Sequence, residues 1–472
     1  MSEACSPVIE ELVPAPSVLQ AVRSLAGWPH LVLFDSALQR PGIGRYSFLT
    51  ADPCRYWERE SVSFGDRPFD EIRETLAGCP TVPVAGLPPF QGGAAGLLGY
   101  DLGHAWERLP RPQWNEFPVP ALAVGLYDWV LAWDHQQQRA WIISQGFPEL
   151  IPERRQRRAA ERLQSVRQQL QAPVETLPEE WLPPAHPIPA PLGATQHPLA
   201  GRPGLTSSFS HDDYLTTVER ALEYIRAGDI FQVNLSQRLL APLQISIPDL
   251  YDRLRQRNPA PFAGLLAGNG WFLASASPER FLTLRDRLVE TFPIKGTRQR
   301  RSGPEADLYT RDELRESAKD QAENIMIVDL MRNDLSRVCR PGSIRVTDLC
   351  RVETYETVQH LVSTVQGELP AGRDAWDVLA ATFPGGSITG APKVRAMQII
   401  AELEPTARGA YCGSLFYVGY DGQMDSNILI RTFTIQQGWV QCPVGGGIVA
   451  RSEPFIEYEE TWHKADGMLR AL

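Results

Sequence analysis

Apolar and polar residues alternate along this chain with two different periods, which predict strands and helices in separate blocks. Short apolar or alternating runs between turn residues are typical of strands, whereas apolar residues three and four apart are typical of amphipathic helices. Because strands and helices come in blocks rather than in strict alternation, we expect an α+β fold with large antiparallel sheets. The strands are expected at residues 31–34, 121–133 (two strands), 271–275, 281–284, 288–292, 415–420, 428–436 and 439–443, and the helices at 153–171, 210–228, 312–331 and from about 454 onward.

One further strand is expected after Gly228, where the helix that begins after Ser210 ends. In this strand Phe231, Val233 and Leu235 alternate with polar residues. Since successive side chains of a strand point to opposite faces, a complete polar set lies on one face. That set is Gln232, Asn234, Ser236 and Arg238.

A proline-rich, poorly periodic stretch between Pro173 and Pro203 divides the chain of 472 residues. Such a composition is typical of a linker or a surface crossing. The length is sufficient for two or three domains. We therefore expect an N-terminal domain of residues 1–172, a linker of residues 173–205 and a C-terminal domain of residues 206–472.

The composition is that of an ordinary soluble globular protein, with 43% hydrophobic and 22% charged residues. The net charge of -10 argues against nonspecific nucleic-acid binding, which needs a basic surface. The segment Met1–Ser17 lacks the basic start and apolar core of a signal peptide, and no apolar run approaches membrane-spanning length. The seven scattered cysteines form no CxxC pair and indicate neither a disulfide framework nor a zinc site. We expect a cytoplasmic protein that binds neither nucleic acid nor membranes.

Three glycine-rich runs allow the backbone to approach a neighbour closely. No Lys-Ser/Thr follows the run at residues 92–101, so we expect close packing between strands there rather than a phosphate loop. The runs at residues 384–393 and 445–447 expose backbone amides that suit an anion, although packing at turns would also explain them.

The segment Phe292–Arg298 holds one lysine, Lys295, between an apolar run and a Gly-Thr turn. A surface lysine at the end of a strand is one interpretation. The other is an amine nucleophile whose pKa is lowered by neighbouring cations and partial burial. Gly296 lets the backbone come close to a ligand, and Thr297 and Arg298 offer donors to an anion. The segment alone does not decide between these interpretations.

Two pairs of acids stand three residues apart on predicted helices, so both carboxylates of each pair point the same way. Together they can form an oxygen-rich site for Mg²⁺, which takes few protein ligands and keeps room for water and an anionic substrate. The alternative is two solvated helix faces. The apolar residues after Glu323 make that helix partly buried, which favours the metal site because a buried acid needs a partner. The pairs are Asp320 with Glu323 and Glu457 with Glu460.

Other polar residues in apolar surroundings are candidates for function. Glu279, in a turn between strands, could serve as a general acid if desolvated, or form an ion pair with Arg280 or Arg298. His360 fits a satisfied core histidine better than a catalyst. Arg431 lies in an otherwise apolar predicted strand, where a guanidinium needs a carboxylate. A dense cluster at a helix end is explained more simply by an Arg–Asp pair with caps than by a second metal site. The cluster is Asp329, Arg332, Asn333 and Asp334.

Several short motifs occur together along the chain. They are the glycine run at 92–101, Gly-Asp-Ile-Phe-Gln-Val (228–233), Ser-Pro-Glu (277–279), Pro-Ile-Lys-Gly-Thr (293–297), Ala-Glu-Asn (322–324), Val-Asp-Leu-Met-Arg-Asn-Asp (328–334) and the run at 385–393. Together they resemble the chorismate-utilising enzymes, a family that includes anthranilate, aminodeoxychorismate, isochorismate and salicylate synthases. The resemblance covers nearly the whole chain. It implies a fold like that of anthranilate synthase component I, in which large antiparallel sheets form a two-lobed sandwich with helices on the outside.

The resemblance also implies roles for single residues. Lys295 and Glu279 would be catalytic, with Glu279 as the acid that assists loss of the C4 hydroxyl of chorismate. The Mg²⁺ ligands would be Glu323 and Glu460 directly, with Asp320 and Glu457 acting through water. The substrate carboxylates would be held by Tyr411, Arg431, Lys464 and the amides of Gly446 and Gly447, and the pocket would be lined by Thr297, His360 and Ser387.

Two positions distinguish members of this family. Members that add water carry a lysine base where this chain has Gln232, which disfavours isochorismate and salicylate chemistry. Anthranilate synthases usually have Ala where Lys295 stands, and a lysine there is typical of aminodeoxychorismate synthase component I. The implied reaction is attack of Lys295 on C2 of Mg²⁺-bound chorismate, loss of the C4 hydroxyl and addition of ammonia at C4. The product would be 4-amino-4-deoxychorismate on the folate (4-aminobenzoate) route.

The resemblance implies a partner as well. The chain has no Gly-x-Cys-x-Gly glutaminase elbow, and Cys412 stands in another context, so ammonia would come from a separate glutaminase subunit (a class I amidotransferase, component II) or from solution. Two alternatives are anthranilate synthase component I and a noncatalytic amino-acid-binding or scaffolding subunit. One region resembles the tryptophan-binding region of related proteins, which leaves open whether this chain binds tryptophan. It comprises Asp35, Ser36, Arg45 and Tyr46.

Overall fold

The computed structural model describes residues 6–39, 42–173, 176–186, 190, 192–299, 303–354 and 358–472. The side chains of residues 297, 299, 304–306 and 358 lie outside this description. Across the described ranges, none of the helices combines the length and the apolar character needed to cross a membrane.

Two antiparallel sheets form the interior of the molecule. The 13-stranded sheet runs in the order β1 (Val8–Leu12), β8 (Arg139–Ser144), β7 (Trp129–Asp134), β3 (Tyr46–Thr50), β2 (Val32–Asp35), β12 (Phe262–Ala267), β13 (Trp271–Ser277), β22 (Thr432–Gln436), β23 (Trp439–Val449), β11 (Gln232–Pro242), β10 (Thr206–Ser207) and β9 (His197–Pro198), and β19 (Gly390–Ala391) pairs with β11. The 10-stranded sheet runs in the order β16 (Ile294–Gln299), β18 (Val358–Glu368), β15 (Leu288–Thr291), β14 (Arg280–Arg285), β21 (Met424–Asn427), β20 (Ser414–Gly419), β5 (Gly93–Leu98), β6 (Leu122–Tyr127) and β4 (Arg55–Arg59), and β17 (Arg345–Thr354) pairs with β18.

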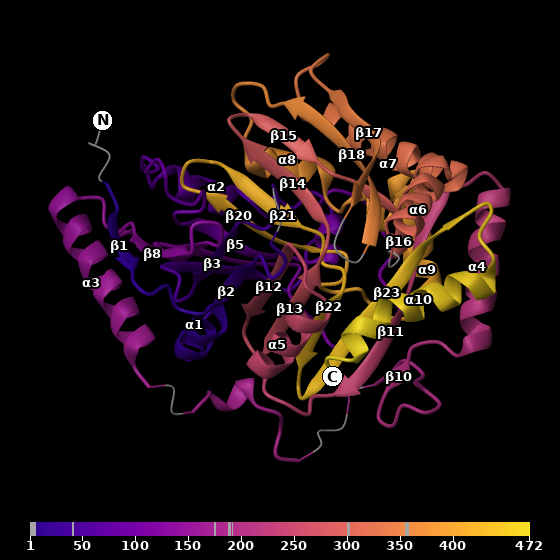
Figure 1. The fold of residues 1–472 in the computed structure, drawn as a ribbon, viewed down its shortest axis with the longest axis horizontal. Helices are drawn as coiled ribbons and strands as arrows, with labels where there is room; N and C mark the ends of the chain where they lie inside the picture. The colour runs from indigo at the N-terminus through magenta and orange to yellow at the C-terminus, as the bar shows by residue number, and fades with distance from the viewer. Residues whose placement is uncertain are drawn as a thin grey trace.

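Helices surround the two sheets, with α3 and α4 at opposite ends of the molecule (Figure 1). The expected α+β fold with large antiparallel sheets is therefore confirmed. The helices are α1 (Val18–Leu25), α2 (Asp70–Ala77), α3 (Pro152–Gln171), α4 (His211–Arg226), α5 (Ile247–Arg257), α6 (Pro304–Glu316), α7 (Ala318–Ser336), α8 (Ala375–Thr382), α9 (Lys393–Leu403) and α10 (Pro454–Leu469), and the short 3₁₀ helices are η1 (Tyr100–Ala105), η2 (Glu179–Trp181) and η3 (Gly386–Ile388).

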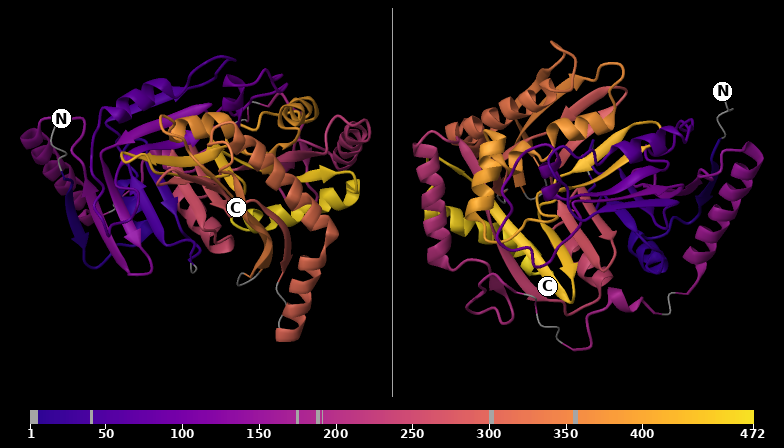
Figure 2. Two further views of the ribbon diagram at one scale, coloured as in Figure 1. Left: turned by 90° about the horizontal axis from the view of Figure 1, so that it is seen from above. Right: turned by 180° about the vertical axis from the view of Figure 1, so that it is seen from behind.

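Both sheets contain strands from the two halves of the sequence. In the 13-stranded sheet β2 pairs with β12, and in the 10-stranded sheet β5 pairs with β20. The indigo and magenta strands of the N-terminal half consequently run beside the later strands in both views of Figure 2. The division into residues 1–172, 173–205 and 206–472 describes the sequence and stays a prediction, whereas in space the two halves share their sheets.

Three expected elements differ clearly in their bounds. The expected strand at 439–443 continues as β23 to Val449, so the glycines at 445–447 lie within a strand rather than after it. The expected helix at 312–331 is two helices, α6 and α7, because Ser317 interrupts it and accepts a hydrogen bond from the amide of Asp320 at 3.3 Å as the cap of α7. The expected strand at 428–436 begins only at Thr432. The cause is Arg431, whose φ of 51° lies in the left-handed region and cannot continue a strand.

The apolar sides of α7 and α10 hold these helices against different sheets. Ile327, Val328 and Met331 of α7 are buried with residues of the 10-stranded sheet, and Ala465 and Met468 of α10 are buried with residues of the 13-stranded sheet. Figure 1 shows α7 near β18 and α10 along β23, in agreement with their contacts. Burial of one large apolar side chain contributes about 1.5–3 kcal/mol. The apolar residues thus fix where the acidic residues of both helices lie.

The glycines of β5 allow it to pack closely between β20 and β6, as expected for the run at 92–101. A Cβ added to Gly93 would lie 2.2 Å from the carbonyl oxygen of Val418 on β20. A Cβ added to Gly96 would lie 2.0 Å from the carbonyl oxygen of Ala123 on β6. Neither space admits a side chain, so the interpretation as close packing is confirmed.

We predict that Gly96→Ala lowers the free energy of unfolding by about 3 kcal/mol, because the new Cβ would overlap a backbone oxygen that the sheet holds in place. Urea unfolding followed by circular dichroism measures this change. Gly27→Ala serves as the control, since nothing lies within 4 Å of a Cβ added there, and it should change stability by no more than about 0.5 kcal/mol. Equal unfolding midpoints for the two variants would contradict the packing argument.

Candidate active site

Lys295 lies on β16, where the pairing with β18 shifts between Lys295 and Thr297. Gly296 at this irregularity has a φ of 70°, and a Cβ added to it would lie 3.0 Å from the Cβ and Cγ of Asp320. The sequence suggests that Gly296 admits a ligand, but the structure shows that it admits α7. Gly296 therefore brings the lysine strand directly against the helix that carries the first acid pair.

The amine of Lys295 is surrounded by charges of both signs. Burial lowers its pKa, the carboxylates of Glu323, Glu279 and Glu460 raise it, and the ammonium of Lys464 lowers it. The net result is a lowered pKa, caused mainly by loss of water. A lysine on an open strand end would not show this shift, so the interpretation as an amine of reduced basicity fits the structure better.

Glu279 lies where the chain crosses from one sheet to the other, between β13 and β14. Its carboxylate is buried and accepts a 2.8 Å hydrogen bond from the hydroxyl of Ser387 on η3. Burial raises its pKa, against the opposing effects of the Ser387 hydrogen bond and of Lys295, Lys464 and Arg431. A buried carboxyl with a raised pKa is suited to keep and deliver a proton.

The alternative interpretation of Glu279, an ion pair with Arg280 or Arg298, is not found in the described part of the chain. Arg280 binds both oxygens of Asp425, at 2.9 and 3.0 Å. Arg298 instead joins Glu313 of α6 at 3.1 Å to Asp320 of α7 at 3.0 Å. Both arginines therefore pair with carboxylates other than that of Glu279.

Arg431 lies at the second crossing between the sheets, between β21 and β22. Burial lowers its pKa, and the charge of Glu279 raises it. Glu279 is thus a carboxylate that acts on this guanidinium electrostatically. The two crossings place an acid and a cation together at the point where the two sheets meet.

The acid pair on α10 lies against the glycines of β23. Glu457 is 3% exposed and accepts a hydrogen bond from Ser452 at 2.5 Å, and Glu460 forms an ion pair with Lys464 at 2.7 Å. A Cβ added to Gly446 would lie 3.3 Å from Glu457 Oε2 and 3.6 Å from both Glu460 Oε1 and Lys464 Nζ. The glycine thus leaves a space into which all three polar groups point.

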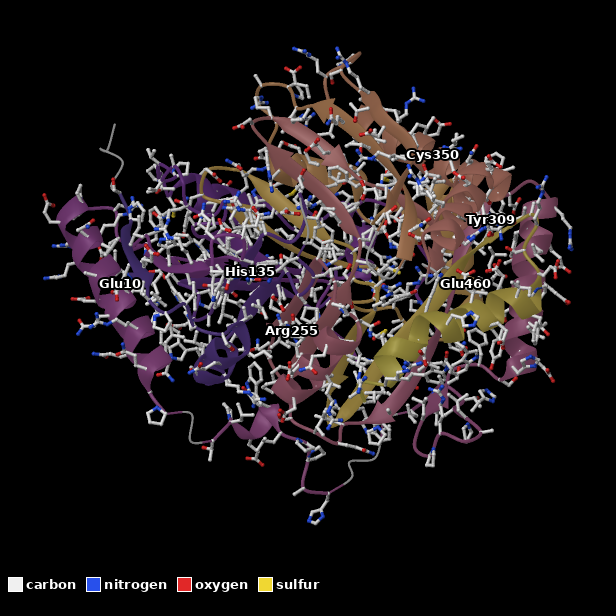
Figure 3. The ribbon with its side chains drawn as sticks, in the orientation of Figure 1. Glu10, His135, Arg255, Tyr309, Cys350 and Glu460 are labelled. Atoms are coloured by element: carbon white, nitrogen blue, oxygen red, sulfur yellow. The ribbon has the colours of Figure 1, made fainter. Side chains whose placement is uncertain are left out.

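The two acids on α10 titrate differently. Burial raises the pKa of Glu457, and the neighbouring charge of Glu460 raises it further. Burial also acts to raise the pKa of Glu460, but Lys464, Lys295 and Lys319 together lower it below its usual value. Figure 3 labels Glu460 on α10. Since Glu457 is buried, the acidic side of α10 is not a solvated helix face.

The acid pair on α7 faces the same group of charges. Glu323 lies 3.9 Å from the amine of Lys319, and Asp320 accepts the hydrogen bond of Arg298. Burial raises the pKa of Glu323, Lys295 and Lys319 lower it, and Asp320 and Glu460 raise it. Glu323 and Glu460 therefore act on each other electrostatically although 137 positions separate them in the chain.

The acids suit a cation that needs few protein ligands. Among the described residues, no three His, Cys, Asp or Glu side chains come close enough together to ligate a metal. Mg²⁺ typically uses one or two carboxylates and completes its shell with water and substrate oxygens. Glu323 on α7 and Glu460 on α10 could supply two such carboxylates, since each acts on the other electrostatically. The donor set therefore fits Mg²⁺ but not a metal that demands a full protein shell.

The profile of the family described as chorismate binding enzyme matches residues 37–470 of the chain. The chain belongs to this family. It is 40% identical to aminodeoxychorismate synthase component 1 of Klebsiella aerogenes over 465 residues, which cover 95% of each protein. It is 42% identical to anthranilate synthase component 1 of Thermus thermophilus over 386 residues, which cover 82% of this chain and 78% of that protein.

A solved structure agrees with this membership. The crystal structure of anthranilate synthase component I from Streptococcus pneumoniae TIGR4 superposes with a TM-score of 0.76 at 30% sequence identity, covering 91% of this chain and 93% of that chain. The fold implied by the motifs is therefore confirmed, and the chain is an enzyme of the chorismate-binding family. The roles given to single residues stay predictions.

The other residues expected to bind substrate in this chorismate-binding enzyme lie on β18, just before β20 and on β23. His360 on β18 is half-buried and stands opposite Thr297 of β16, whose side chain lies outside the described residues. Tyr411 is buried beside Arg408, with the ring 5.7 Å from the guanidinium. Gly447 lies beside Gln232, whose Nε2 would be 3.0 Å from an added Cβ.

Sequence reasoning missed a buried ion pair behind the site. Arg408 binds both oxygens of Glu404, at 2.7 and 2.8 Å, and both side chains are almost fully buried. Glu404 also accepts hydrogen bonds from the amide and hydroxyl of Ser236 on β11, each at 2.8 Å. Because α9 ends at Leu403, Glu404 and Arg408 are not neighbours on a helix, and their four-residue spacing gave no signal for this contact.

The cluster at the end of α7 contains the expected ion pair. Among the described residues, no second metal site was found. Arg332 binds Asp329 at 2.8 Å on the surface. Asp334, by contrast, is buried and pairs with Lys393 of α9 at 2.5 Å. The lysine comes from a distant part of the sequence, and for this reason the partner could not be anticipated.

The four residues expected near tryptophan line one cavity of about 430 Å³, distant in the fold from the acid pairs. Its walls include aromatic rings of Phe34, Phe262 and Tyr417. The charged groups already have partners: Arg45 binds Asp134 at 2.6 Å, and Asp35 binds Arg255 at 3.0 Å and Tyr251 at 2.9 Å. Figure 3 labels His135 and Arg255 in this region. The four expected residues that line the cavity are Asp35, Ser36, Arg45 and Tyr46.

We predict that Glu279→Gln makes the protein more stable than the wild type at high pH. Burial raises the pKa of Glu279 in the folded chain above its unfolded value, so its contribution to stability is complete below the unfolded pKa and is lost as pH rises through the folded pKa. Gln keeps an oxygen for the Ser387 hydroxyl and cannot ionise. At pH 8 the variant should be more stable than the wild type, by about 1.4 kcal/mol for each unit of the raised pKa.

Urea unfolding between pH 5 and pH 8 measures this difference. Glu402→Gln, on the exposed surface of α9, controls for the loss of one carboxylate. A stability difference between Glu279→Gln and the wild type that does not change with pH would show that burial does not govern the titration of Glu279.

Proposed function

We propose that this enzyme aminates chorismate at C4 with ammonia and gives 4-amino-4-deoxychorismate, the precursor of 4-aminobenzoate on the folate route. The observation that carries the proposal is the position of Lys295 among Glu279, Glu323, Glu460 and Lys464. A lysine at this place is what the resemblance associates with aminodeoxychorismate synthase component I. The 40% identity to the Klebsiella aerogenes protein of that name over 95% of the chain supports it.

In the proposed reaction the nitrogen of Lys295 bonds to C2 of chorismate while the C4–O bond breaks. Glu279 gives its proton to the departing hydroxyl, which leaves as water. Ammonia then bonds to C4 as the C2–lysine bond breaks, and the neutral amine of Lys295 is restored. The surplus proton on the new C4 nitrogen returns to Glu279, so the sum is replacement of the hydroxyl, lost as water, by an amino group. The enolpyruvyl group is retained. The lowered pKa of Lys295 and the raised pKa of Glu279 favour the neutral amine and the protonated acid that this sequence needs.

Other residues would bind the substrate rather than react with it. Arg431 and Lys464 are cations whose charges act on Glu279, and they suit the two carboxylates of chorismate. Mg²⁺ would be held by Glu323 and Glu460, with Asp320 and Glu457 acting through water, and would supply charge neutralisation to a bound carboxylate.

The ammonia would come from a glutaminase partner, a class I amidotransferase of the component II type. The name component 1 of the relatives agrees with such a partner. Cys412 does not serve as a glutaminase nucleophile in this chain, because it is 1% exposed and burial raises its pKa to about 12. A cytoplasmic location is part of the same proposal.

Tryptophan binding is a separate proposal that the amination does not require. The aromatic walls of the cavity beside Asp35 suit an indole ring. Asp35 itself is already bound by Arg255 and Tyr251, so an amino group of tryptophan would compete with these contacts.

The second candidate function is that of anthranilate synthase component I, which the 42% identity to the Thermus thermophilus protein favours. In that reaction pyruvate is eliminated and an aromatic product appears. The two candidates therefore differ in a product that can be measured directly, and overall identity does not separate them.

We predict that the wild type, given chorismate, ammonium and Mg²⁺, forms 4-amino-4-deoxychorismate without releasing pyruvate. Lys295→Ala should reduce this activity by at least about a hundredfold, since it removes the nucleophile of a covalent step. Lys295→Arg is the matched control for charge, because it keeps a cation that cannot act as a nucleophile. Both variants should lose activity to the same extent.

Liquid chromatography of the products and fluorescence of anthranilate provide the readouts. Rescue of the rate by Lys295→Arg would show that the charge rather than the nucleophile matters. Fluorescent anthranilate as the main wild-type product would replace the proposal by the second candidate function.

We predict that Glu323→Gln and Glu460→Gln each raise the Mg²⁺ concentration for half-maximal activity by at least about tenfold, because each removes one of two anionic ligands. Calorimetric titration with Mg²⁺ should show the same loss of affinity in the absence of substrate turnover. Glu459→Gln, beside Glu460 on the same helix, is the control and should leave the Mg²⁺ requirement unchanged. Unaltered Mg²⁺ affinity in both site variants would remove the acids from the metal site.

A further inference from the structure

The segment between α8 and α9 carries a hydrogen-bond donor to Glu279, the acid of the proposed reaction. Ser387 of this segment donates to Glu279 Oε1 at 2.8 Å. Within the described residues 383–392, the regular structure consists of the short η3 and the two-residue β19. Elements of this length do not hold themselves in place, so contacts with other parts of the chain have to fix the Ser387 hydroxyl.

A buried lysine ties the two ends of this segment together. Lys393, the first residue of α9, donates to the carbonyl oxygen of Thr382, the last residue of α8, at 2.6 Å. Its amine also pairs with Asp334, near the end of α7, at 2.5 Å. The side chains of the lysine and the aspartate are 12% and 6% exposed. A single ammonium thus joins three helices and closes residues 383–392 into a loop, the 383–392 loop.

The charges at this junction balance one another away from water. Burial lowers the pKa of Lys393, Asp334 raises it, Arg337 lowers it and Glu107 raises it. Burial raises the pKa of Asp334, and Lys393 opposes this effect. If either member of the pair were replaced, the other would stay buried without its counter-charge. Replacement of either one therefore loosens the junction of the three helices.

The 383–392 loop rests directly on α7. Gly386 precedes Ser387, and a Cβ added to this glycine would lie 2.4 Å from Leu330 Cδ2 on α7. Glu323, the proposed metal ligand, lies 11 positions before Asp334 on the same helix, which is about three turns. One helix therefore positions a proposed metal ligand and also supports the loop that carries the donor to Glu279.

On its other side the 383–392 loop is held by the 13-stranded sheet and by Arg408. The amide of Asn234 on β11 donates to the carbonyl oxygen of Thr389 at 2.8 Å, and Arg408 donates to that of Ile388 at 3.0 Å. These contacts follow Ser387 in the chain and do not involve Lys393. Replacement of Lys393 would consequently release the side of the loop that faces α7 and leave the other side attached.

The Ser387 hydrogen bond acts on Glu279 beside charges from other elements. Burial raises the pKa of Glu279, and the Ser387 hydrogen bond lowers it. Because this hydrogen bond favours the ionised carboxylate, its loss would raise the pKa further. The charged and titratable groups that also act on Glu279 are Lys295 on β16, Lys464 on α10, Arg431 between β21 and β22, and Cys412 before β20.

We propose that Lys393 is a positioning residue that keeps the Ser387 hydroxyl on Glu279 by tying both ends of the 383–392 loop to α7. Its amine bonds to Asp334 and to the carbonyl of Thr382, and it acts on Glu279 through the loop. The inference rests on the role that the proposed function gives to Glu279. The proton affinity of Glu279 can be measured without turnover, so the inference and the proposed function can fail separately.

The test measures the pKa of Glu279 in the wild type, in Ser387→Ala, in Lys393→Met and in the double variant. In each background, urea unfolding between pH 5 and pH 9 is compared with and without Glu279→Gln, and the pH at which the two stability curves separate gives the pKa. Ser387→Ala should move this pH upward by about one unit, as expected for loss of a hydrogen bond to a charged group. Lys393→Met should move it in the same direction, and the double variant should move it no further than Ser387→Ala alone.

Arg238→Met is the matched control, because it breaks another buried ion pair of similar exposure. Arg238 on β11 pairs with Glu116 at 2.5 Å, and their side chains are 4% and 3% exposed. This variant should lose stability at every pH and keep the pKa of Glu279. Asp334→Asn gives a second measurement if Lys393→Met does not fold, since it keeps an oxygen for Lys393 and removes the charge. The pKa of Glu279 should rise in this variant too, by a smaller amount.

Several results would overturn the inference. An unchanged pKa of Glu279 in Ser387→Ala, or in both Lys393→Met and Asp334→Asn, would leave Lys393 a purely structural role. An equal rise in Arg238→Met would make the effect general, and additive effects in the double variant would show that Lys393 does not act through Ser387.

The pH above which amination declines should rise together with the pKa of Glu279, because the acid has to be protonated to act. If the pKa rises in Lys393→Met and this pH does not, the role of Glu279 in the proposed function fails alone, and the positioning by Lys393 stands.

Discussion

The site depends on one electrostatic constraint, which is that charges removed from water have to be balanced by other charges. Lys295 loses water at the β16 irregularity, and this burial lowers its pKa. The carboxylates of Glu279, Glu323 and Glu460 oppose that shift, and Lys464 adds to it. The charge of a single amine is therefore set by residues from a strand crossing and two helices. No one pair of residues determines it.

The fold brings these residues together by letting the chain cross between its two sheets. Glu279 lies in the crossing from β13 to β14, and Arg431 lies in the crossing from β21 to β22. The helix α7 packs on the 10-stranded sheet and α10 packs along β23 of the 13-stranded sheet. The separation of the two acid pairs is consequently fixed by how the sheets meet. A change in the packing between sheets would move the acids without altering any of them.

Local patterns in the sequence gave correct information where the physics is local. The i,i+3 spacing placed both acids of each pair on one helix side, and the glycines of residues 92–101 were correctly assigned to strand packing. The break at Ser317 and the bound state of Arg280 were missed, because a side-chain cap and a distant carboxylate decided them. The burial of the polar face of β11 was also missed. Alternation predicts two faces but does not say what covers each one.

Membership in the family leaves the chemistry undetermined, because an aminodeoxychorismate synthase component 1 and an anthranilate synthase component 1 are 40% and 42% identical to this chain. Lys295 is a more specific criterion. The proposed attack by Lys295 needs its neutral amine, whereas the neighbouring acids favour the charged form. Glu323 and Glu460 raise the pKa of Lys295, so any cation that neutralises these carboxylates lowers it. Burial already lowers the pKa of Lys295 against the effect of these acids, and a cation at Glu323 and Glu460 would act in the same direction as burial.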